Sequence, residues 1–194
     1  EIINFVASSR RFMPHFHLPL QSGSDHVLQL MRRHYDTSLF ASRIEKILHT
    51  MPDAFIGVDL ITGAMGETPA HFDESLRFIE RLPVSRLHVF PYSERAGTRA
   101  LEIRPRVEPS ERHERCRTMI AVSDRKLAEF QRRYEGTTRK VLVEHSVSAD
   151  GHMYGFTDNY IKVEMPADLG LFNRIVDTRL TAGGKDFMKG IPAK

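Results

Sequence analysis

Cysteine and tryptophan are almost missing from this sequence. Cys116 is the only cysteine among 194 residues, and there is no tryptophan. A single cysteine excludes a disulfide framework of the kind that stabilises small secreted domains. Free cysteine is usually buried and behaves as a small apolar side chain, so we expect Cys116 to lie in the core.

Long apolar runs are also absent. No stretch approaches the ~20 apolar residues that span a bilayer, so no membrane association is expected. The first residues, EIINFVASSRR, lack the basic start and apolar centre of a signal peptide. They resemble the middle of a helix, which predicts a chain that begins part-way through a larger cytoplasmic protein.

The composition is that of a globular protein. Hydrophobic residues make up 41% of the chain and charged residues 27%, which argues against disorder. The formal net charge of +3 permits an anionic partner without requiring one. The length suits one large domain, or one medium and one small domain.

The first part of the chain alternates between strand and helix patterns. Apolar runs predict buried strands at FHLPL (16–20), FIGVDLIT (55–62) and RLHVFPY (86–92). Amphipathic helices are expected over 37–51 and around 72–82, and Ser24 or Asp25 can cap a further helix. This order predicts βα units with a parallel sheet and right-handed connections.

The second part begins with one long helix and continues with short β-like runs. The helix is expected over 109–134 and ends at Gly136. Its buried stripe is predicted to hold Cys116, Met119, Ile120, Ser123, Leu127, Phe130 and Tyr134. KVLVEH, YIKVEM and IVDTRL, separated by turn sequences, predict a small β-barrel of about sixty residues. We therefore expect two domains, 1–134 and 135–194.

Each predicted strand of the first domain ends in a polar or glycine-rich turn: QSGSD, TGAMGET and PYSERAGT. Ligands bind at the carboxyl ends of parallel strands, because loops and helix N-termini converge there. Taken singly, QSGSD also fits a helix cap and GAMGET a glycine turn. A further alternative is a phosphate-handling α/β-barrel enzyme that uses QSGSD as an anion cradle.

Longer stretches carry a family resemblance. HFHLPLQSGSDHVLQLMRRHY, VDLITGAMGETPAHFDESLRFI and RLHVFPYSERAGTRA resemble the radical S-adenosylmethionine methylthiotransferases. GFTDNYIKV and FNRIVDTRL resemble their terminal TRAM domain, a small RNA-binding β-barrel. The resemblance implies the C-terminal half of a partial (β/α)6 barrel, with three parallel strands, followed by TRAM. HVFPYSERAGT and GFTDNYIKV look most like the branch that methylthiolates N6-threonylcarbamoyladenosine next to the tRNA anticodon; sister enzymes act on isopentenyladenosine or a ribosomal-protein aspartate.

The resemblance also implies cofactors. Family members use S-adenosylmethionine and two 4Fe-4S clusters, one of them held by a Cys-x3-Cys-x2-Cys loop. Cluster iron requires thiolate ligands, and this chain has one cysteine. We therefore expect no catalytic residue and no metal ligand here, and no activity from these residues alone.

By the resemblance, the carboxyl ends of the strands would contact S-adenosylmethionine. For Phe90 and Tyr92, core packing is an equal alternative. Where the family usually has Phe-Pro, this chain has Ala64 and Met65, so the adenine contact is expected to differ. The expected contacts are Gln21, Ser22, Gly23, Ser24, Ile61, Gly63, Phe90, Pro91 and Tyr92.

The tail combines basic and aromatic residues, which is typical of single-stranded RNA recognition. Its expected partner is a tRNA anticodon stem-loop. Because strands alternate their faces, about half of these side chains should be core. The candidates are Arg139, Lys140, Tyr154, Phe156, Asn159, Tyr160, Lys162, Arg174, Lys185 and Lys189. A non-catalytic RNA-binding module is a further alternative.

Other charged residues support weaker hypotheses. His15 and His17 share a strand face, but without further ligands they predict polar barrel-interior residues rather than a metal pair. Asp59, mid-strand, should be paired or point into a polar lumen. Most arginines between 104 and 133, including Arg112 and Arg115, are interleaved with acids and predict a solvated face. An unpaired edge at FHLPL predicts self-association.

Overall fold

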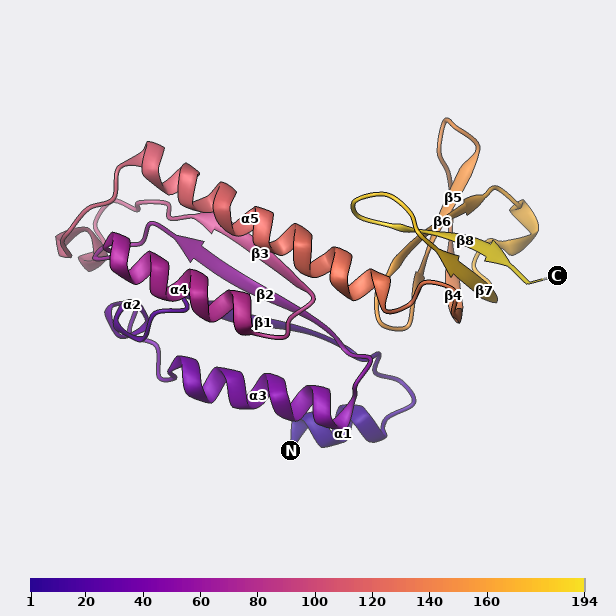
Figure 1. Ribbon diagram of the computed structural model, residues 1–194, viewed down its shortest axis with the longest axis horizontal. Helices are drawn as coiled ribbons and strands as arrows, with labels where there is room; N and C mark the ends of the chain where they lie inside the picture. The colour runs from indigo at the N-terminus through magenta and orange to yellow at the C-terminus, as the bar shows by residue number, and fades with distance from the viewer. Residues whose placement is uncertain (194) are drawn as a thin grey trace. The chain divides into compact units, whose positions relative to one another are not determined.

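A computed structural model describes residues 1–193 and divides the chain into two compact units. The sheet unit comprises residues 16–52 and 56–124, and the barrel unit comprises residues 1–15, 53–55 and those from 125 onward. Figure 1 labels their helices and strands. The predicted boundary lies near residue 135, whereas by their contacts the last turns of the long helix group with the barrel.

The sheet has the strand order β1-β2-β3, in which β2 and β3 run parallel. The strands are β1 (His15–Gln21), β2 (Phe55–Thr62) and β3 (Arg86–Pro91). The helices are α2 (Asp25–Leu30), α3 (Thr37–Thr50) and α4 (Pro69–Arg81), with a short η1 (Arg99–Glu102) after β3. The alternation of strands and helices predicted from the sequence is thus confirmed.

Side chains at the helix starts explain where the helices begin. The Asp36 carboxylate accepts a hydrogen bond from the Leu39 N–H at 2.7 Å. Thr68 and His71 form a reciprocal capping box at α4. Ser24 occupies the N-cap position of α2 but makes no cap hydrogen bond, because its hydroxyl donates to Glu74 at 2.6 Å. Asp25 instead accepts from the Thr37 N–H at 2.7 Å.

The long helix α5 (Pro109–Arg132) lies along the free edge of β3 (Figure 1). The Ser123 hydroxyl bonds both the N–H (2.9 Å) and the carbonyl (3.0 Å) of Leu87. The buried Cys116 thiol lies 3.8 Å from the Val89 carbonyl, as a core position requires. The predicted stripe is wrong at Ile120, which is 42% exposed.

Strand β1 is less buried than predicted. Only Leu20 is fully buried, and His17 and Pro19 are exposed. The reason is that β1 is an edge strand of the sheet, next to β2 on one side. The Tyr35 hydroxyl donates to the carbonyls of Pro19 (2.7 Å) and Leu20 (3.0 Å), which satisfies two acceptors. Self-association through β1 stays a prediction.

The barrel unit contains a closed barrel with the strand order β4-β5-β6-β8-β7. The predicted small barrel is therefore confirmed, although the sequence patterns identified only three of its strands. The strands are β4 (Thr138–Val147), β5 (His152–Thr157), β6 (Lys162–Pro166), β7 (Ile175–Thr181) and β8 (Met188–Pro192). This unit also contains α1 (Ile2–Ser8) and η2 (Leu169–Leu171).

The barrel core includes residues from outside the barrel. Four residues that precede the barrel strands are buried together with the inward side chains of the barrel: Phe55, Leu127, Phe130 and Tyr134. The Phe55 and Phe130 rings meet edge-to-face, with centroids 5.3 Å apart. The inward side chains are Val141, Val143, Met153, Ile161, Val163, Met165, Leu180 and Met188.

Among residues 1–193, no helix combines the length and apolar character that crossing a bilayer requires.

Candidate functional site

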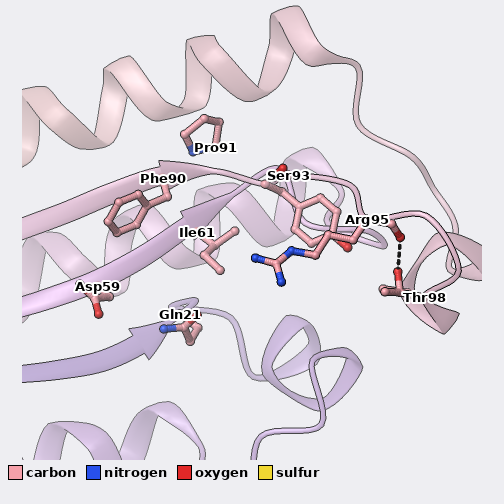
Figure 2. Close-up of a pocket in the computed structure, with 10 residues that line it drawn as sticks. Gln21, Asp59, Ile61, Phe90, Pro91, Ser93, Arg95 and Thr98 are labelled. Carbon is pink, nitrogen blue, oxygen red and sulfur yellow. Dashed lines mark hydrogen bonds between the residues drawn. The ribbon is translucent and has the colours of Figure 1, made fainter.

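The carboxyl ends of the strands border a cavity of about 450 Å³ (Figure 2). This volume lies within the usual range for small-molecule sites. Five of the nine residues expected at the cofactor line it: Gln21, Ile61, Phe90, Pro91 and Tyr92. The lining is completed by Asp59, Ser93, Arg95, Thr98 and Ala100.

Ser22, Gly23 and Ser24 lie outside this lining and hold the loop against α4. The Ser22 and Ser24 side chains are buried, and the Ser22 hydroxyl accepts from the Ser24 N–H at 3.2 Å. The Gly23 N–H donates to the Ser75 hydroxyl at 2.9 Å, and a Cβ on Gly23 would approach the Ser75 backbone to 2.9 Å. The small polar cluster after β1 therefore permits close packing of a helix.

Gln21 has an unusual backbone conformation. Its φ is +74°, in the left-handed region that residues other than glycine rarely adopt. Such conformations carry strain and concentrate at functional sites. In Figure 2 the Gln21 side chain lies at the cavity with Ile61 and Arg95.

A histidine–aspartate cluster lies within the sheet, a few residues before the carboxyl ends of the strands. His17 Nε2 is 2.6 Å from Asp59 Oδ1, and the His17 and His88 rings stack with centroids 4.8 Å apart. Asp59 pairs in register with His88 across β2 and β3. Burial and the neighbouring His17 lower the pKa of His88, which favours the neutral imidazole. Asp59 is thus paired, as the sequence predicted.

His15 does not join this cluster. Its ring stacks on Phe55 (5.3 Å) and Tyr160 (4.2 Å) within the barrel unit. Within the part of the chain that the structure describes, no group of three or more His, Cys, Asp or Glu side chains is arranged to hold a metal ion.

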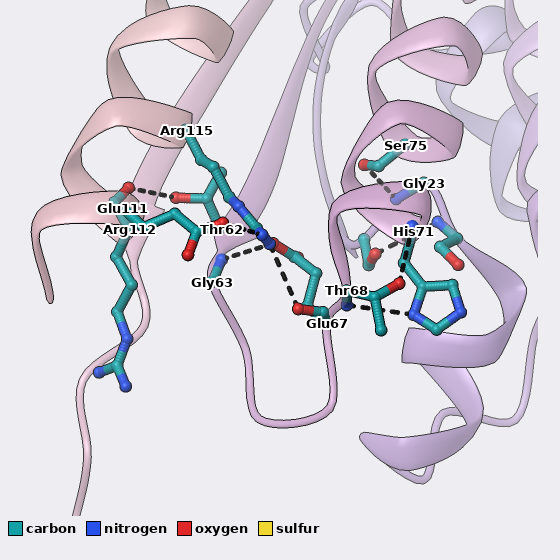
Figure 3. A network of polar contacts seen from close by, with 12 residues as sticks. Gly23, Thr62, Gly63, Glu67, Thr68, His71, Ser75, Glu111, Arg112 and Arg115 are labelled. Atoms are coloured by element: carbon teal, nitrogen blue, oxygen red, sulfur yellow. Dashed lines mark hydrogen bonds and ion pairs between the residues drawn. The ribbon is translucent and has the colours of Figure 1, made fainter. Parts of the chain in front are cut away.

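A buried ion pair fixes the turn after β2 (Figure 3). Glu67 accepts hydrogen bonds from the Gly63 N–H at 2.9 Å and from Arg115 Nη1 at 2.5 Å. Arg115 also pairs with Glu111 on its own helix. Burial raises the pKa of Glu67, and the Arg115 hydrogen bond opposes that shift. The predicted solvated position of Arg115 is wrong, because this carboxylate requires a buried partner.

Arg112 is the second buried arginine that the sequence placed in solvent. Its guanidinium donates to the Tyr92 carbonyl at 3.2 Å and to the Glu94 carboxylate at 2.5 Å. A Cβ on Gly63, whose φ is +72°, would lie 2.3 Å from Arg112 Cγ. Gly63 is therefore required by the packing of Arg112, and both residues shape the loops around the cavity.

The exterior of the barrel carries a row of four residues, here called the exterior row: Ile175, Leu142, Phe156 and Lys162. Each is paired in register with the next across β7, β4, β5 and β6. Ile175 is 65% exposed and Leu142 is 52% exposed, so apolar surface faces solvent. Lys162 Nζ lies 4.1 Å from the centre of the Tyr154 ring. Arg174, next to Ile175, is also exposed.

Tyr160 lies near this row. Its side chain is 50% exposed, one face stacks on His15, and the Phe156 ring is 6.1 Å away. Its φ of +61°, in the turn between β5 and β6, is rare for an aromatic residue. Half of the ring thus remains available to a ligand.

Asn159 and Arg139, both predicted to contact RNA, are engaged by polar partners within the protein. Asn159 is fully buried, and its amide donates to the Asp53 carbonyl at 2.9 Å while accepting from Thr157 at 2.6 Å. It is not on the surface that RNA would meet. Arg139 bonds Asp53 (2.8 Å) and Asp158 (2.7 Å), so two carboxylates already neutralise it.

Lys140 is 73% exposed and pairs only loosely, at 3.3 Å, with Asp177. Such an exposed pair contributes little and leaves the ammonium available to a phosphate. The exposed tail lysines, Lys185 and Lys189, lie on or just before β8.

The single cysteine does not fit an iron–sulfur cluster. Cluster iron is held by several thiolates, and burial raises the pKa of the Cys116 thiol away from the thiolate form. The residues of this chain therefore do not fit a cluster.

Comparisons with known proteins identify relatives along almost the whole chain. It is 34% identical over 193 residues to the threonylcarbamoyladenosine tRNA methylthiotransferase MtaB of Bacillus subtilis, covering 98% of this chain and 43% of the relative. The MtaB of Thermotoga maritima is 33% identical, covering 100% and 46%. The tRNA-2-methylthio-N(6)-dimethylallyladenosine synthase of Symbiobacterium thermophilum is 33% identical, covering 98% and 41%.

No family model matches the chain. Among solved structures, the coproporphyrinogen III oxidase HemN of Escherichia coli, described as a radical SAM enzyme, aligns with a TM-score of 0.48 and 15% identity over 93% of this chain and 46% of that one. A likeness of this extent decides neither fold nor function. The chain spans somewhat under half the length of the curated relatives it matches. Over that length it is a homologue of tRNA methylthiotransferases, among them proteins named for threonylcarbamoyladenosine and for dimethylallyladenosine.

Proposed function

We propose that this chain is part of a cytoplasmic enzyme that methylthiolates threonylcarbamoyladenosine in tRNA. The observation that carries the proposal is the identity of 34% over 98% of the chain to a protein named for that reaction. The cavity at the strand ends supports it, because parallel sheets bind their ligands at this edge.

S-adenosylmethionine is the proposed cofactor, and it supplies the methyl group of the product. Ile61 and Phe90 offer apolar surface for the adenine, and Gln21 offers an amide for polar groups. Pro91 and Tyr92 close the cavity beside them. The other four expected residues do not line the cavity, and their contacts hold the loops next to it in place. They are Ser22, Gly23, Ser24 and Gly63.

The iron–sulfur clusters of the whole protein are proposed to be held by cysteines outside this sequence, since Cys116 does not fit a cluster. The part that the present residues play is binding and orientation of cofactor and substrate.

The barrel is proposed to act as a TRAM domain that holds the anticodon stem-loop. The exterior row offers the apolar side chains of Ile175, Leu142 and Phe156, with the cation Lys162 at one end and the exposed Arg174 next to Ile175 at the other. Tyr160 offers a half-exposed ring for base stacking. Because lysine and arginine would contact phosphates, the affinity for RNA should fall steeply as salt rises.

Replacing Tyr160 with glycine should weaken anticodon stem-loop binding by roughly 1–3 kcal/mol, the usual value of one base-stacking aromatic. Glycine accepts the positive φ of this position, so relief of backbone strain offsets part of the lost His15 contact. The midpoint of thermal unfolding should change little. Tyr160→Phe is the matched control and should retain the affinity. A glycine variant with unchanged affinity per folded molecule would exclude the stacking role.

The function itself is tested by disrupting the gene that encodes this chain and measuring tRNA nucleosides by mass spectrometry. We expect loss of 2-methylthio-N6-threonylcarbamoyladenosine, accumulation of its unthiolated precursor, and recovery with the intact gene. Loss of 2-methylthio-dimethylallyladenosine instead would assign the chain to the sister branch. An unchanged nucleoside profile would leave the RNA-binding module as the better description.

A further inference from the structure

The cavity chemistry bears on which modified adenosine is the substrate. Relatives at nearly equal identity are named for two substrates, threonylcarbamoyladenosine and dimethylallyladenosine. The first carries N–H groups, a hydroxyl and a carboxylate on its threonylcarbamoyl group, whereas the second carries only a hydrocarbon. A site for the first needs a cation and a hydrogen-bond acceptor beside its apolar surface.

One cation faces the cavity. Figure 2 shows the Arg95 side chain reaching back over the cavity toward Ile61 and Gln21. Among residues 1–193, its guanidinium has no ion-pair or hydrogen-bond partner. Two nearby arginines differ, since Arg106 and Arg112 both pair with Glu94. A guanidinium left free at a cavity binds a carboxylate through two parallel hydrogen bonds.

One acceptor lies on the cavity wall. Asp59 lines the cavity, and its Oδ1 is 2.6 Å from His17 Nε2. Within the described residues its second oxygen, Oδ2, has no partner and can accept from a ligand N–H or O–H. His88 stacks on His17, with ring centroids 4.8 Å apart. The cluster thus fixes the orientation of Asp59.

We infer that Arg95 and Asp59 select the threonylcarbamoyl group, Arg95 by binding its carboxylate and Asp59 by accepting from its N–H or hydroxyl groups. This inference rests on the proposed function and adds the residues that distinguish the two substrates. His17 and His88 are positioning residues, since they act through Asp59. The methionine end of S-adenosylmethionine also bears a carboxylate, so it is the competing source of the same chemistry.

The test is nucleoside binding to the 194-residue chain, measured by ligand-observed NMR. The ligands are N6-threonylcarbamoyladenosine, its methyl ester, N6-dimethylallyladenosine and S-adenosylmethionine. The acid should bind about tenfold or more tightly than its ester, as expected for one hydrogen-bonded ion pair. Arg95→Gln should abolish that preference, and Asp59→Asn should weaken acid and ester alike. Arg81→Gln, on the exposed last turn of α4, is the charge-matched control and should change nothing.

Equal binding of acid and ester, a preference that survives Arg95→Gln, or no saturation by any nucleoside would overturn the inference. So would an Arg95→Gln variant that loses S-adenosylmethionine affinity while its nucleoside affinities stay unchanged, because Arg95 would then bind the methionine carboxylate. The two proposals can fail separately. If gene disruption removes the methylthio group from tRNA but the chain binds acid and ester equally, the proposed function stands and only the role of Arg95 and Asp59 is contradicted. Thermal unfolding of each variant verifies that it is folded.

Discussion

Replacing Arg115 with methionine should lower the free energy of unfolding by about 3–5 kcal/mol at neutral pH. The Glu67 side chain is 2% exposed and that of Arg115 is 6% exposed, so the substitution leaves a buried carboxylate without its cation. Glu67 also holds the turn after β2, because it accepts a hydrogen bond from the Gly63 N–H. Urea unfolding of the 194-residue chain measures the change.

The pH dependence of the same variant provides a second readout. Burial already raises the pKa of Glu67, and loss of Arg115 removes the hydrogen bond that opposes this shift. The folded state then binds a proton that the unfolded state has released, so stability falls as pH rises. The variant should therefore recover part of its lost stability when the pH is lowered toward the ordinary glutamate range.

The double variant Glu67→Gln/Arg115→Met is the control, because it leaves no unpaired charge. It should lose less stability than the sum of the two single variants. An Arg115→Met variant with wild-type stability, or strictly additive losses, would mean that the ion pair does not hold this turn.

Replacing Gly63 with alanine should cost about 2–5 kcal/mol of folding stability. The left-handed conformation costs an L-residue about 1–2 kcal/mol, and overpacking a fixed neighbour typically adds 1–3 kcal/mol. The clash is with Arg112 Cγ at 2.3 Å, and Arg112 is fixed by its pair with Glu94. Urea unfolding again measures the effect.

Gly97 provides the matched control for this experiment. Its φ of +76° is nearly that of Gly63, but a Cβ there meets no atom within 4 Å among the described residues. Gly97→Ala should therefore cost only about 1–2 kcal/mol, the conformational part alone. Equal losses at the two glycines would show that Arg112 does not constrain the turn.

The sequence predicted the elements whose signals are local. Strand 55–62 agrees residue for residue with β2, and the helix expected over 37–51 agrees within one residue with α3, because periodicity and the Asp36 cap act within a few residues. Strands β5 and β8 were missed, since Gly155 and Gly190 interrupt their apolar alternation. Both glycines are required inside the barrel, where a Cβ on Gly155 would lie 2.6 Å from Val141 Cγ1.

The site was predictable only in part, because its partners are distant in sequence. The edge of the sheet followed from where the strands end, and the family resemblance supplied five of the residues that line the cavity there. The buried roles of Arg112 and Arg115 did not, since Glu67 is 48 positions from Arg115 and nothing local distinguishes these arginines from solvated ones. Asn159 resembled a surface residue of a turn, but its partner Asp53 lies 106 positions away.

The most direct test of the central claim is to map where the substrate nucleoside binds. Backbone amide NMR spectra of the 194-residue chain should be recorded while N6-threonylcarbamoyladenosine is added. We predict shifts at the cavity residues Asp59 and Arg95, with the exterior row of the barrel unchanged. Shifts confined to the barrel, or none anywhere, would contradict the assignment of the strand ends as the site that receives the modified adenosine.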